Sequence, residues 1–378
     1  MAEFYRSSFG DNSNKNTPLW LVIADVLMWA ITIVTLAALL IIFMGRFISP
    51  ERMWYFSLLG LAAPAFYIAA ILTMLYWIIR WKWIPITVTG IFVIAGLFHV
   101  SMYYKLDLSK QYGEESYDKS CIKVLTFNTR SFHDDNWDST VDSVAKTVVS
   151  LNPDIICFQE FLLDPKRKAE IIERLSDYNM SGKRLESGSS LSECFTKYPV
   201  CAVYKIEFEG TGSCTCTDLR INDDTVRIYN VHLQTTSVTS ADKSYISNAE
   251  FIEDSTRDSR FIQIAQSLRK NNAVRARQAE IIRNDMKECP YPIILCGDFN
   301  DVPVSYTYRT MSAGLEDAFR RKGHKYACTY RGFFDALRID YVFSSPDLFT
   351  VESCEILPTG DISDHYPVFV RLKLTSKQ

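Results

Sequence analysis

The chain has 378 residues, of which 48% are hydrophobic and 22% are charged, and its formal net charge is −3. These values exclude an intrinsically disordered chain, and the length allows two or more domains. The apolar residues are unevenly distributed, so the N-terminal third has the composition of a membrane protein.

Three apolar runs dominate that N-terminal third: Leu19–Met44, Trp54–Ile79 and Trp83–Tyr104. Each is close to the ~20 residues that a helix needs to cross the hydrocarbon core, and almost all charged residues fall in the short connectors. We therefore expect three transmembrane helices, which form a membrane anchor over residues 19–105 after an N-terminal tail over residues 1–18. This predicts a multi-pass integral membrane protein in contact with the lipid bilayer.

A cleaved signal peptide is the alternative for the first run. It is disfavoured because the apolar part is too long, a long polar segment precedes it, and two further apolar runs follow. Asp25 lies near the start of this run, where we expect an interfacial position and assign no role. Basic residues are balanced between the two sides of the predicted anchor, so they do not predict its orientation.

The chain changes character after the anchor. Residues 106–120 are polar and are predicted to be a linker, and residues 121–378 alternate short apolar runs with helical stretches, as in an α/β domain. The predicted strands are Ile122–Phe127, Ile155–Phe158, Cys201–Tyr204, Val226–Val231, Ile293–Leu295, Ile339–Phe343 and Pro367–Leu374. The predicted helices are Val141–Leu151, Lys166–Leu175 and Ser259–Met286, and the last is either continuous or broken at Asn271 and Asn272.

A polar side chain stands at the boundary of almost every predicted strand of this domain. Ligands of open α/β folds collect at one edge of a sheet, so these residues are expected to converge. They are Asn128, Glu160, His232, Asp298, Asn300, Asp340, Asp364 and His365.

The carboxylates of this set predict a metal site. Glu160, Asp298 and Asp364 supply the hard oxygen ligands that suit Mg²⁺ or Mn²⁺. The remaining types suit hydrolysis of a phosphate ester, because amides hydrogen-bond phosphate oxygens and His365 beside Asp340 is a candidate oriented base.

Six motifs occur in order along the domain: FNTRSF, CFQEF, YNVHLQ, GDFNDVPVSYTY, RIDYVF and SDHYPV. In this order they resemble the endonuclease/exonuclease/phosphatase superfamily, which includes deoxyribonucleases, abasic-site endonucleases, neutral sphingomyelinases and inositol-polyphosphate 5-phosphatases. The resemblance covers residues 122–374. It implies a two-sheet α/β sandwich that hydrolyses phosphate esters with Mg²⁺ or Mn²⁺.

The resemblance also implies roles for individual residues. Glu160 corresponds to the principal metal ligand, with Asn128 beside it and Asp364 completing the acidic set. The site is expected to bind a phosphorylated substrate next to this metal.

The same resemblance implies the catalytic groups. His365, paired with Asp340, corresponds to the general base or phosphate-polarising group. Asp298 corresponds to the residue that positions the attacking water, and Asn300 and His232 correspond to groups that stabilise charge on the non-bridging oxygens.

Two positions depart from the abasic-site endonucleases. Arg130 stands where they place an acidic or amide residue, and His232 stands where they use a tyrosine. The sequence is therefore more similar to the deoxyribonuclease, sphingomyelinase and phosphatase branches.

The substrate class stays open between two alternatives. The predicted domain carries 32 Lys and Arg against 36 Asp and Glu, whereas a generic nucleic-acid binder is basic. A membrane anchor favours a membrane-associated, lipid-linked phosphate ester over nucleic acid, with a membrane-tethered nuclease as the alternative. A local basic face would favour the nuclease, and its candidates are Arg257, Arg260, Arg269, Lys270, Arg275, Arg277 and Arg283.

A degenerate, non-enzymatic binding module is disfavoured, because every expected catalytic position holds a competent residue type. The ten cysteines all lie in the predicted catalytic domain. Cys157, Cys201 and Cys296 are expected to be small core residues, whereas Cys214 and Cys216, or Cys194 with a neighbouring cysteine, are candidates for oxidation in an exported domain.

Overall fold

A computed structural model describes residues 18–105, 120–184, 191–236, 257–332 and 337–375. Almost all of the predicted tail and linker lies outside these ranges. The chain divides into two compact units: one comprises Ala62–Gly96 with the described residues up to Ile41, and the other comprises Ile42–Leu61 with those from Leu97 onward. The predicted domain boundaries stay a prediction.

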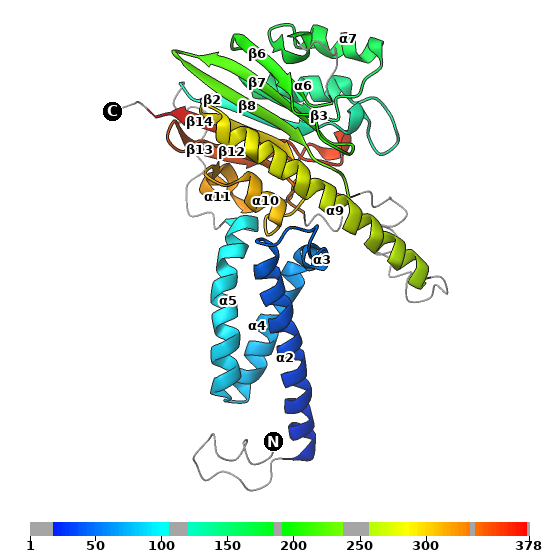
Figure 1. Cartoon of the computed structure of the whole chain (residues 1–378), viewed down its shortest axis with the longest axis vertical. Helices are drawn as coiled ribbons and strands as arrows, with labels where there is room; N and C mark the ends of the chain where they lie inside the picture. Colours follow the sequence, from blue (N-terminus) through cyan, green and yellow to red (C-terminus); the bar gives the residue numbers. More distant parts are fainter. Residues whose placement is uncertain (1–17, 106–119, 185–190, 237–256, 333–336, 376–378) are drawn as a thin grey trace. The chain divides into compact units, whose positions relative to one another are not determined.

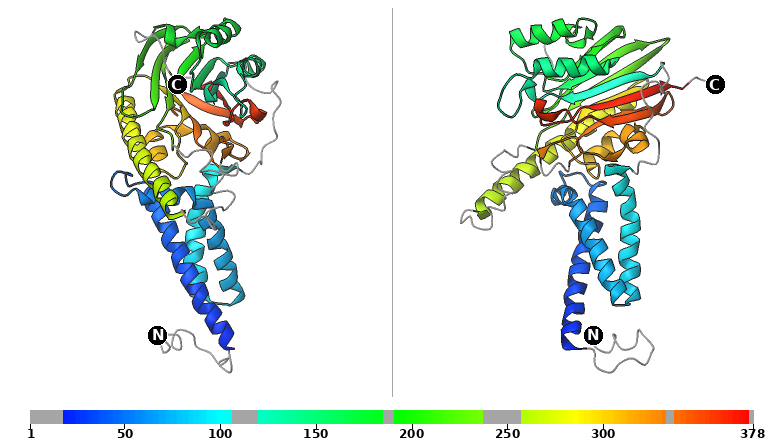
Figure 2. Two further views of the ribbon diagram at one scale, coloured as in Figure 1. Left: turned by 90° about the vertical axis from the view of Figure 1, so that its right-hand side faces the viewer. Right: turned by 180° about the vertical axis from the view of Figure 1, so that it is seen from behind.

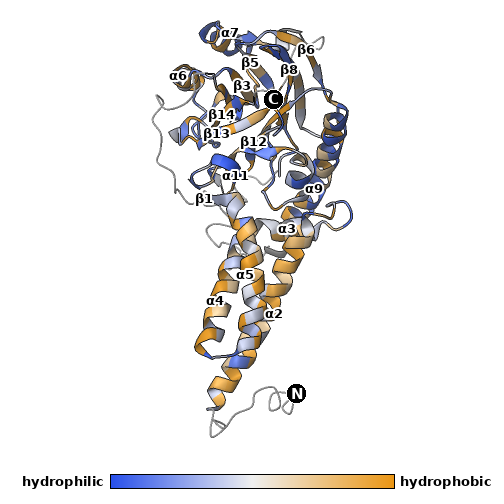
Figure 3. Ribbon diagram, turned by 90° about the vertical axis from the view of Figure 1, so that its left-hand side faces the viewer, coloured by the Kyte–Doolittle hydropathy of each residue, from blue (hydrophilic) through white to orange (hydrophobic). Residues whose placement is uncertain are grey.

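The first unit is helical and apolar, and it contains most of α2 (Leu19–Gly45) and α5 (Trp83–Tyr103) and all of α4 (Ala63–Ile79). Figure 3 shows the apolar colouring along these helices. Within the described part, two helices, α2 and α5, are long and apolar enough to cross a membrane. The expectation of three such helices is therefore wrong. The second expected span is divided between the short α3 (Tyr55–Leu61) and the 17-residue α4, which has a proline in its first turn.

Polar groups of the first unit point inward. Asp25, for which we expected an interfacial position, is only 6% exposed. Its carboxylate accepts hydrogen bonds from Arg80 at 2.8 and 2.9 Å and from the Tyr76 hydroxyl at 2.7 Å. The Trp77 indole likewise donates to Thr32 at 2.9 Å. Many leucine, isoleucine and valine side chains of these helices are exposed instead, the reverse of the distribution in a water-soluble bundle.

The second unit contains two six-stranded sheets with strand orders β10-β12-β9-β8-β7-β6 and β13-β14-β2-β3-β5-β4 (Figure 1). Each sheet contains one parallel pair, β8–β9 and β2–β3, among antiparallel neighbours. The first sheet contains β6 (Val200–Lys205), β7 (Ser213–Ile221), β8 (Asp224–His232), β9 (Ile293–Asp298), β10 (Glu316–Asp317) and β12 (Asp340–Ser344). The second contains β2 (Ile122–Asn128), β3 (Ile155–Gln159), β4 (Asn179–Met180), β5 (Glu193–Thr196), β13 (Phe349–Ile356) and β14 (Val368–Leu374). A further two-stranded ladder pairs β1 (Tyr104–Lys105) with β11 (Lys325–Tyr326).

The main core lies between the two sheets, which face each other in Figure 2. Alternate residues of each strand point into it, among them Val124 of one sheet and Ile228 of the other. Two helices, α6 (Val141–Leu151) and α7 (Pro165–Arg174), cover a second core on the outer face of the β2–β3 sheet. The expected two-sheet α/β sandwich is confirmed.

Three helices accompany the other sheet: α9 (Arg257–Glu288), α10 (Tyr306–Met311) and α11 (Ala318–Lys322). α9 is one continuous helix. Asn271 and Asn272 do not break it because their side chains are buried and bond outside the helix backbone, to the Thr236 carbonyl at 3.0 Å and to the Ser57 hydroxyl at 2.7 Å.

All ten cysteines are described, and all are free thiols. Cys157 and Cys296 are buried as expected, but Cys201 is exposed on the edge strand β6. Cys214 and Cys216 are buried in the first half of β7 and form no disulfide in this structure.

Candidate active site

Strand register aligns three of the expected residues in one row. His232 ends β8 and is the parallel partner of Asp298, which ends β9. Asp298 is in turn the antiparallel partner of Asp340, which begins β12. Residues paired across neighbouring strands present their side chains to the same face, so one imidazole and two carboxylates converge at the end of this sheet.

A glycine permits this strand arrangement. Gly297 precedes Asp298 and has a φ of +130°, a region that L-residues rarely adopt. A Cβ atom built on it would lie 1.9 Å from the carbonyl oxygen of Val231 on β8. The close approach of the two parallel strands at the site therefore requires glycine at this position.

Asn128 joins the two sheets at the site. It ends β2, and its amide nitrogen donates to Asp298 Oδ2 at 3.0 Å and to Glu160 Oε1 at 3.2 Å. Its amide oxygen accepts from the backbone N–H of Arg130 at 3.0 Å. The amide therefore holds two carboxylates from different sheets close together.

Glu160 directly follows β3 with a left-handed φ of 52°. Its side chain is 32% exposed, and its Oε1 atom lies 3.6 Å from His232 Nε2. The same His232 atom lies 3.7 Å from Asp298 Oδ2. Both ring nitrogens of His232 are buried without a hydrogen-bond partner in this structure. They are polar groups that a bound ligand can satisfy.

His365 and Asp340 form a buried pair. Asp340 Oδ2 lies 2.9 Å from His365 Nδ1, and the Tyr330 ring packs beside the imidazole with 4.9 Å between centroids. His365 Nε2 faces Asp298 Oδ2 at 3.8 Å. The carboxylate therefore orients the ring so that Nε2 points into the site.

Charge within this pair shifts both groups. Burial lowers the pKa of His365, but the charges of Asp340 and Asp298 raise it by more, and the resulting pKa is about 10. Burial and the charge of Asp298 raise the pKa of Asp340 to about 6, although His365 opposes the shift. The raised pKa of His365 favours an imidazolium at neutral pH, whereas the raised pKa of Asp340 makes its carboxylate easier to protonate than a free one.

Asn300 turns toward Asp298. It has a φ of 52°, and its backbone N–H donates to Asp298 Oδ1 at 2.7 Å. Its amide nitrogen donates to Asp298 Oδ2 at 3.2 Å and to the Leu233 carbonyl at 3.1 Å. Its contacts thus orient the neighbouring carboxylate.

Asp364 is not brought into the group of metal-ligating side chains. Among the described residues, one set of three acidic and imidazole side chains has ligand atoms that all lie within 4.8 Å of one another. It consists of Asp298, Asp340 and His365, and it includes neither Glu160 nor Asp364. Asp364 is half-buried, and its charge acts on Arg130. Its expected place in the metal set stays a prediction.

The residues present fit a divalent cation. Three carboxylates, Glu160, Asp298 and Asp340, gather at the ends of β3 and β9 and the start of β12. The second oxygen of Asp340, Oδ1, is buried without a hydrogen-bond partner in this structure. A group of hard anionic oxygens suits Mg²⁺ or Mn²⁺. Asn128 would offer its oxygen to such an ion only after a 180° turn of the amide, which would break its bond from Arg130.

Sequence reasoning missed a polar network behind the site. Gln159 and Asn230 are fully buried, and the Gln159 amide nitrogen donates to Asn230 Oδ1 at 2.7 Å. Asn230 donates in turn to the carbonyls of Phe158 at 3.0 Å and Glu193 at 2.9 Å. This network links β8 to the last two residues of β3, and Glu160 is the next residue of the chain. The signal in the sequence is an amide side chain within each apolar strand, one residue before Glu160 in one strand and two residues before His232 in the other.

The expected basic face on α9 does not form as one surface in the described part. Arg275 is 1% exposed, and it donates to the Gln234 carbonyl at 2.9 Å and lies 3.6 Å from Asp301. Arg277 pairs with Glu51 and Arg269 stacks on Trp54. The side chains of Arg257 and Arg260 lie outside the described ones.

Comparisons with known proteins agree with this architecture. A model of the Endonuclease/Exonuclease/phosphatase family matches residues 125–365, and a domain of unknown function, DUF8431, matches residues 25–103. The comparison with curated proteins returns no match.

Solved structures are similar in fold at low identity. An endonuclease/exonuclease/phosphatase from Bacteroides vulgatus is 19% identical with a TM-score of 0.50, and the match covers 68% of this chain and 100% of that one. A humanized D. rerio TDP2 is 15% identical with a TM-score of 0.49, covering 68% and 100% of the two chains. The human Nocturnin catalytic domain is 15% identical with a TM-score of 0.47, covering 68% and 96%.

Proposed function

Because the chain belongs to the endonuclease/exonuclease/phosphatase family, we propose that it hydrolyses a membrane-associated phosphate ester with the help of Mg²⁺ or Mn²⁺ at the site around Asp298. The observation that supports this most is the gathering of carboxylates and imidazoles from both sheets around the Asn128 amide. Like charges repel at such distances, so this group favours the binding of a compensating cation.

Glu160 and Asp298 would hold the cation, and Asn128 would position their carboxylates. When bound, the cation supplies positive charge next to the phosphate oxygens and favours attack by water. Asn128 acts on the reaction through the two carboxylates that it contacts.

The chain's own side chains would handle the substrate and the proton. Asp298, oriented by Asn300, would accept a hydrogen bond from the attacking water. His365 would donate from Nε2 to a phosphate oxygen, and Asp340 would keep the ring in that orientation. His232 would supply a second donor on the Glu160 side, where its nitrogens are otherwise unsatisfied.

Attachment to a membrane is part of this proposal. It is supported by the exposed apolar side chains of α2 and α5, for example Val34, which is 64% exposed, and Ile94, which is 69% exposed. Buried Asp25 and Thr32 are satisfied inside the unit. Side chains distributed in this way suit a lipid surrounding.

A nucleic-acid substrate is the second candidate, and the described basic residues support it less. Arg275 is buried and Arg277 is paired with Glu51, so these two do not present free charge to a phosphate backbone.

The test is a substrate panel with full-length protein in lipid vesicles: a prenyl pyrophosphate, a phospholipid, duplex DNA and RNA, each with Mg²⁺ and with chelator. We expect metal-dependent release of phosphate or a phosphomonoester from a lipid substrate, and its loss in His365→Ala. Rapid cleavage of DNA without lipid turnover would overturn the choice of substrate, and full activity in chelator would overturn the role of the metal.

A further inference from the structure

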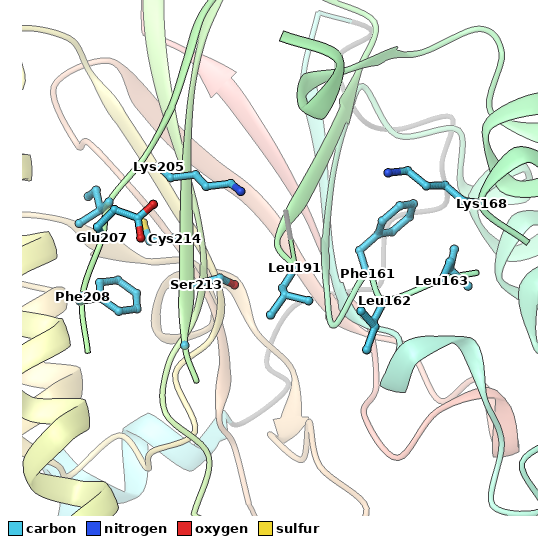
Figure 4. A pocket seen from close by; sticks show the side chains of 12 residues that line it. Phe161, Leu162, Leu163, Lys168, Leu191, Lys205, Glu207, Phe208, Ser213 and Cys214 are labelled. Atoms are coloured by element: carbon cyan, nitrogen blue, oxygen red, sulfur yellow. The ribbon is translucent and has the colours of Figure 1, made fainter. Parts of the chain in front are cut away.

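A pocket of about 350 Å³ opens beside the candidate site, between the connection that follows β3 and the hairpin of β6 and β7 (Figure 4). One wall carries Phe161, which directly follows Glu160. The other wall carries Ser213, which is the cross-strand partner of His232. Both walls therefore continue directly into residues of the candidate site.

The pocket has a charged part. Lys168 of α7 and Lys205 at the end of β6 line it from opposite walls, and Figure 4 shows their ammonium groups directed toward each other. Both side chains are half-buried. Glu207 is the one acidic residue of the lining. Two ammonium groups on opposite walls can together bind one anion placed between them.

The rest of the lining is mostly apolar. Leu162 is 63% exposed and Leu191 is 38% exposed, although both are large hydrophobic side chains. Phe161 and Phe208 complete this apolar part of the lining. The size and the mixture of apolar walls with a few polar groups are typical of a small-molecule site.

From these observations we infer that the pocket holds the non-reacting part of the substrate, which is a phosphate joined to an apolar chain. The phosphate lies between Lys168 and Lys205, and the chain lies against Leu162 and Leu191. This inference rests on the proposed function and specifies its substrate. In a pyrophosphate ester, water adds to the terminal phosphorus and the bond from that phosphorus to the bridging oxygen breaks. Inorganic phosphate leaves, and the monophosphate of the apolar alcohol stays in the pocket.

The lysines are tested by binding, with hydrolysis kept out of the measurement. Full-length His365→Ala in detergent, with chelator present, is titrated by calorimetry with a prenyl pyrophosphate. Lys168→Met and Lys205→Met keep an unbranched side chain that is shorter by one atom and remove its charge. Each is expected to raise the dissociation constant roughly tenfold, since losing a hydrogen bond to a charged group costs about this much. Lys287→Met, an exposed lysine on α9, is the matched control and is expected to change nothing.

Two further ligands, inorganic pyrophosphate and single-stranded DNA, show whether the bound phosphate belongs to a molecule with an apolar chain. Leu162→Ser is expected to weaken binding of the prenyl pyrophosphate about threefold or more, because apolar burial is lost, and to leave inorganic pyrophosphate unaffected. Unchanged affinity in both lysine variants would overturn the inference. A different result would assign the pocket to nucleic acid: single-stranded DNA binds, the lysine variants weaken that binding, and Leu162→Ser changes the affinity for no ligand. This result would overturn the inference that the ligand carries an apolar chain. The binding titration does not depend on turnover. A wild-type protein that hydrolyses no ester would therefore refute the proposed function, whereas the ligand of the pocket is decided by the binding data alone.

Discussion

The amide nitrogen of Asn128 on β2 lies 3.0 Å from Asp298 Oδ2 on β9, and this hydrogen bond joins the two sheets at the candidate site. The same nitrogen donates to Glu160 Oε1, so one side chain separates two carboxylates that would otherwise repel. We predict that Asn128→Ala and Asn128→Asp each lower turnover by about 10- to 100-fold, as is usual for residues that orient metal ligands. Asn284→Ala on the surface of α9 is the matched control. Steady-state kinetics would contradict the role if the folded Asn128→Ala protein kept wild-type turnover.

The pair of His365 and Asp340 is expected to act as one unit. His365→Ala and Asp340→Asn should each reduce turnover by ~10²-fold or more, because a positioned acid or base contributes ~10² to 10⁴. The double variant should lose little beyond the worse single variant, since the carboxylate acts through the ring. His324→Ala serves as the control. Additive losses in the double variant would show that the two residues act independently.

Divalent cations should stabilise the fold as well as support activity. At a concentration 100 times the dissociation constant, Mg²⁺ or Mn²⁺ is expected to stabilise the protein by about 2.7 kcal/mol. For a chain of this size such a gain raises the Tm by several degrees, roughly 2–4 °C per kcal/mol. Thermal unfolding of wild type and Glu160→Gln in the presence and absence of metal checks this. An equal metal-induced shift in both proteins would remove Glu160 from the ligand set.

Gly297 is predicted to be essential for the fold at the site. Gly297→Ala should lower the free energy of unfolding by more than about 3 kcal/mol, since it adds backbone strain at φ +130° to a Cβ placed 1.9 Å from the Val231 oxygen. Gly360→Ala is a matched control, because that glycine has a φ of +69° with nothing within 4 Å. It should cost only the left-handed strain of about 1–2 kcal/mol. Chemical denaturation of the full-length protein measures both, and equal losses would show that the contact with Val231 is unimportant.

Local sequence determined much of this protein. The period of apolar residues predicts a helix over Val141–Leu151, which are the bounds of α6 in the structure. The prediction succeeds because the buried residues of α6 recur at helical spacing along the sequence. Motifs at strand ends likewise predicted Asp298, His365 and their neighbours as site residues. Such residues can be found in the sequence because a site at a sheet edge needs polar side chains directly after or before apolar strands. By contrast, the division of the second apolar run between α3 and α4 was missed, since composition alone does not distinguish one helix from two.

The contacts that make the site were decided by tertiary structure. Asn128 and Asp298 are 170 residues apart, and only strand register and the packing of two sheets bring the amide of one to the carboxylate of the other. The same long-range packing buries Arg275, a polar side chain that sequence alone does not distinguish from the exposed arginines of α9. Side-chain types and spacing are local properties of a chain, whereas the distance between two charges depends on every strand pairing that lies between them.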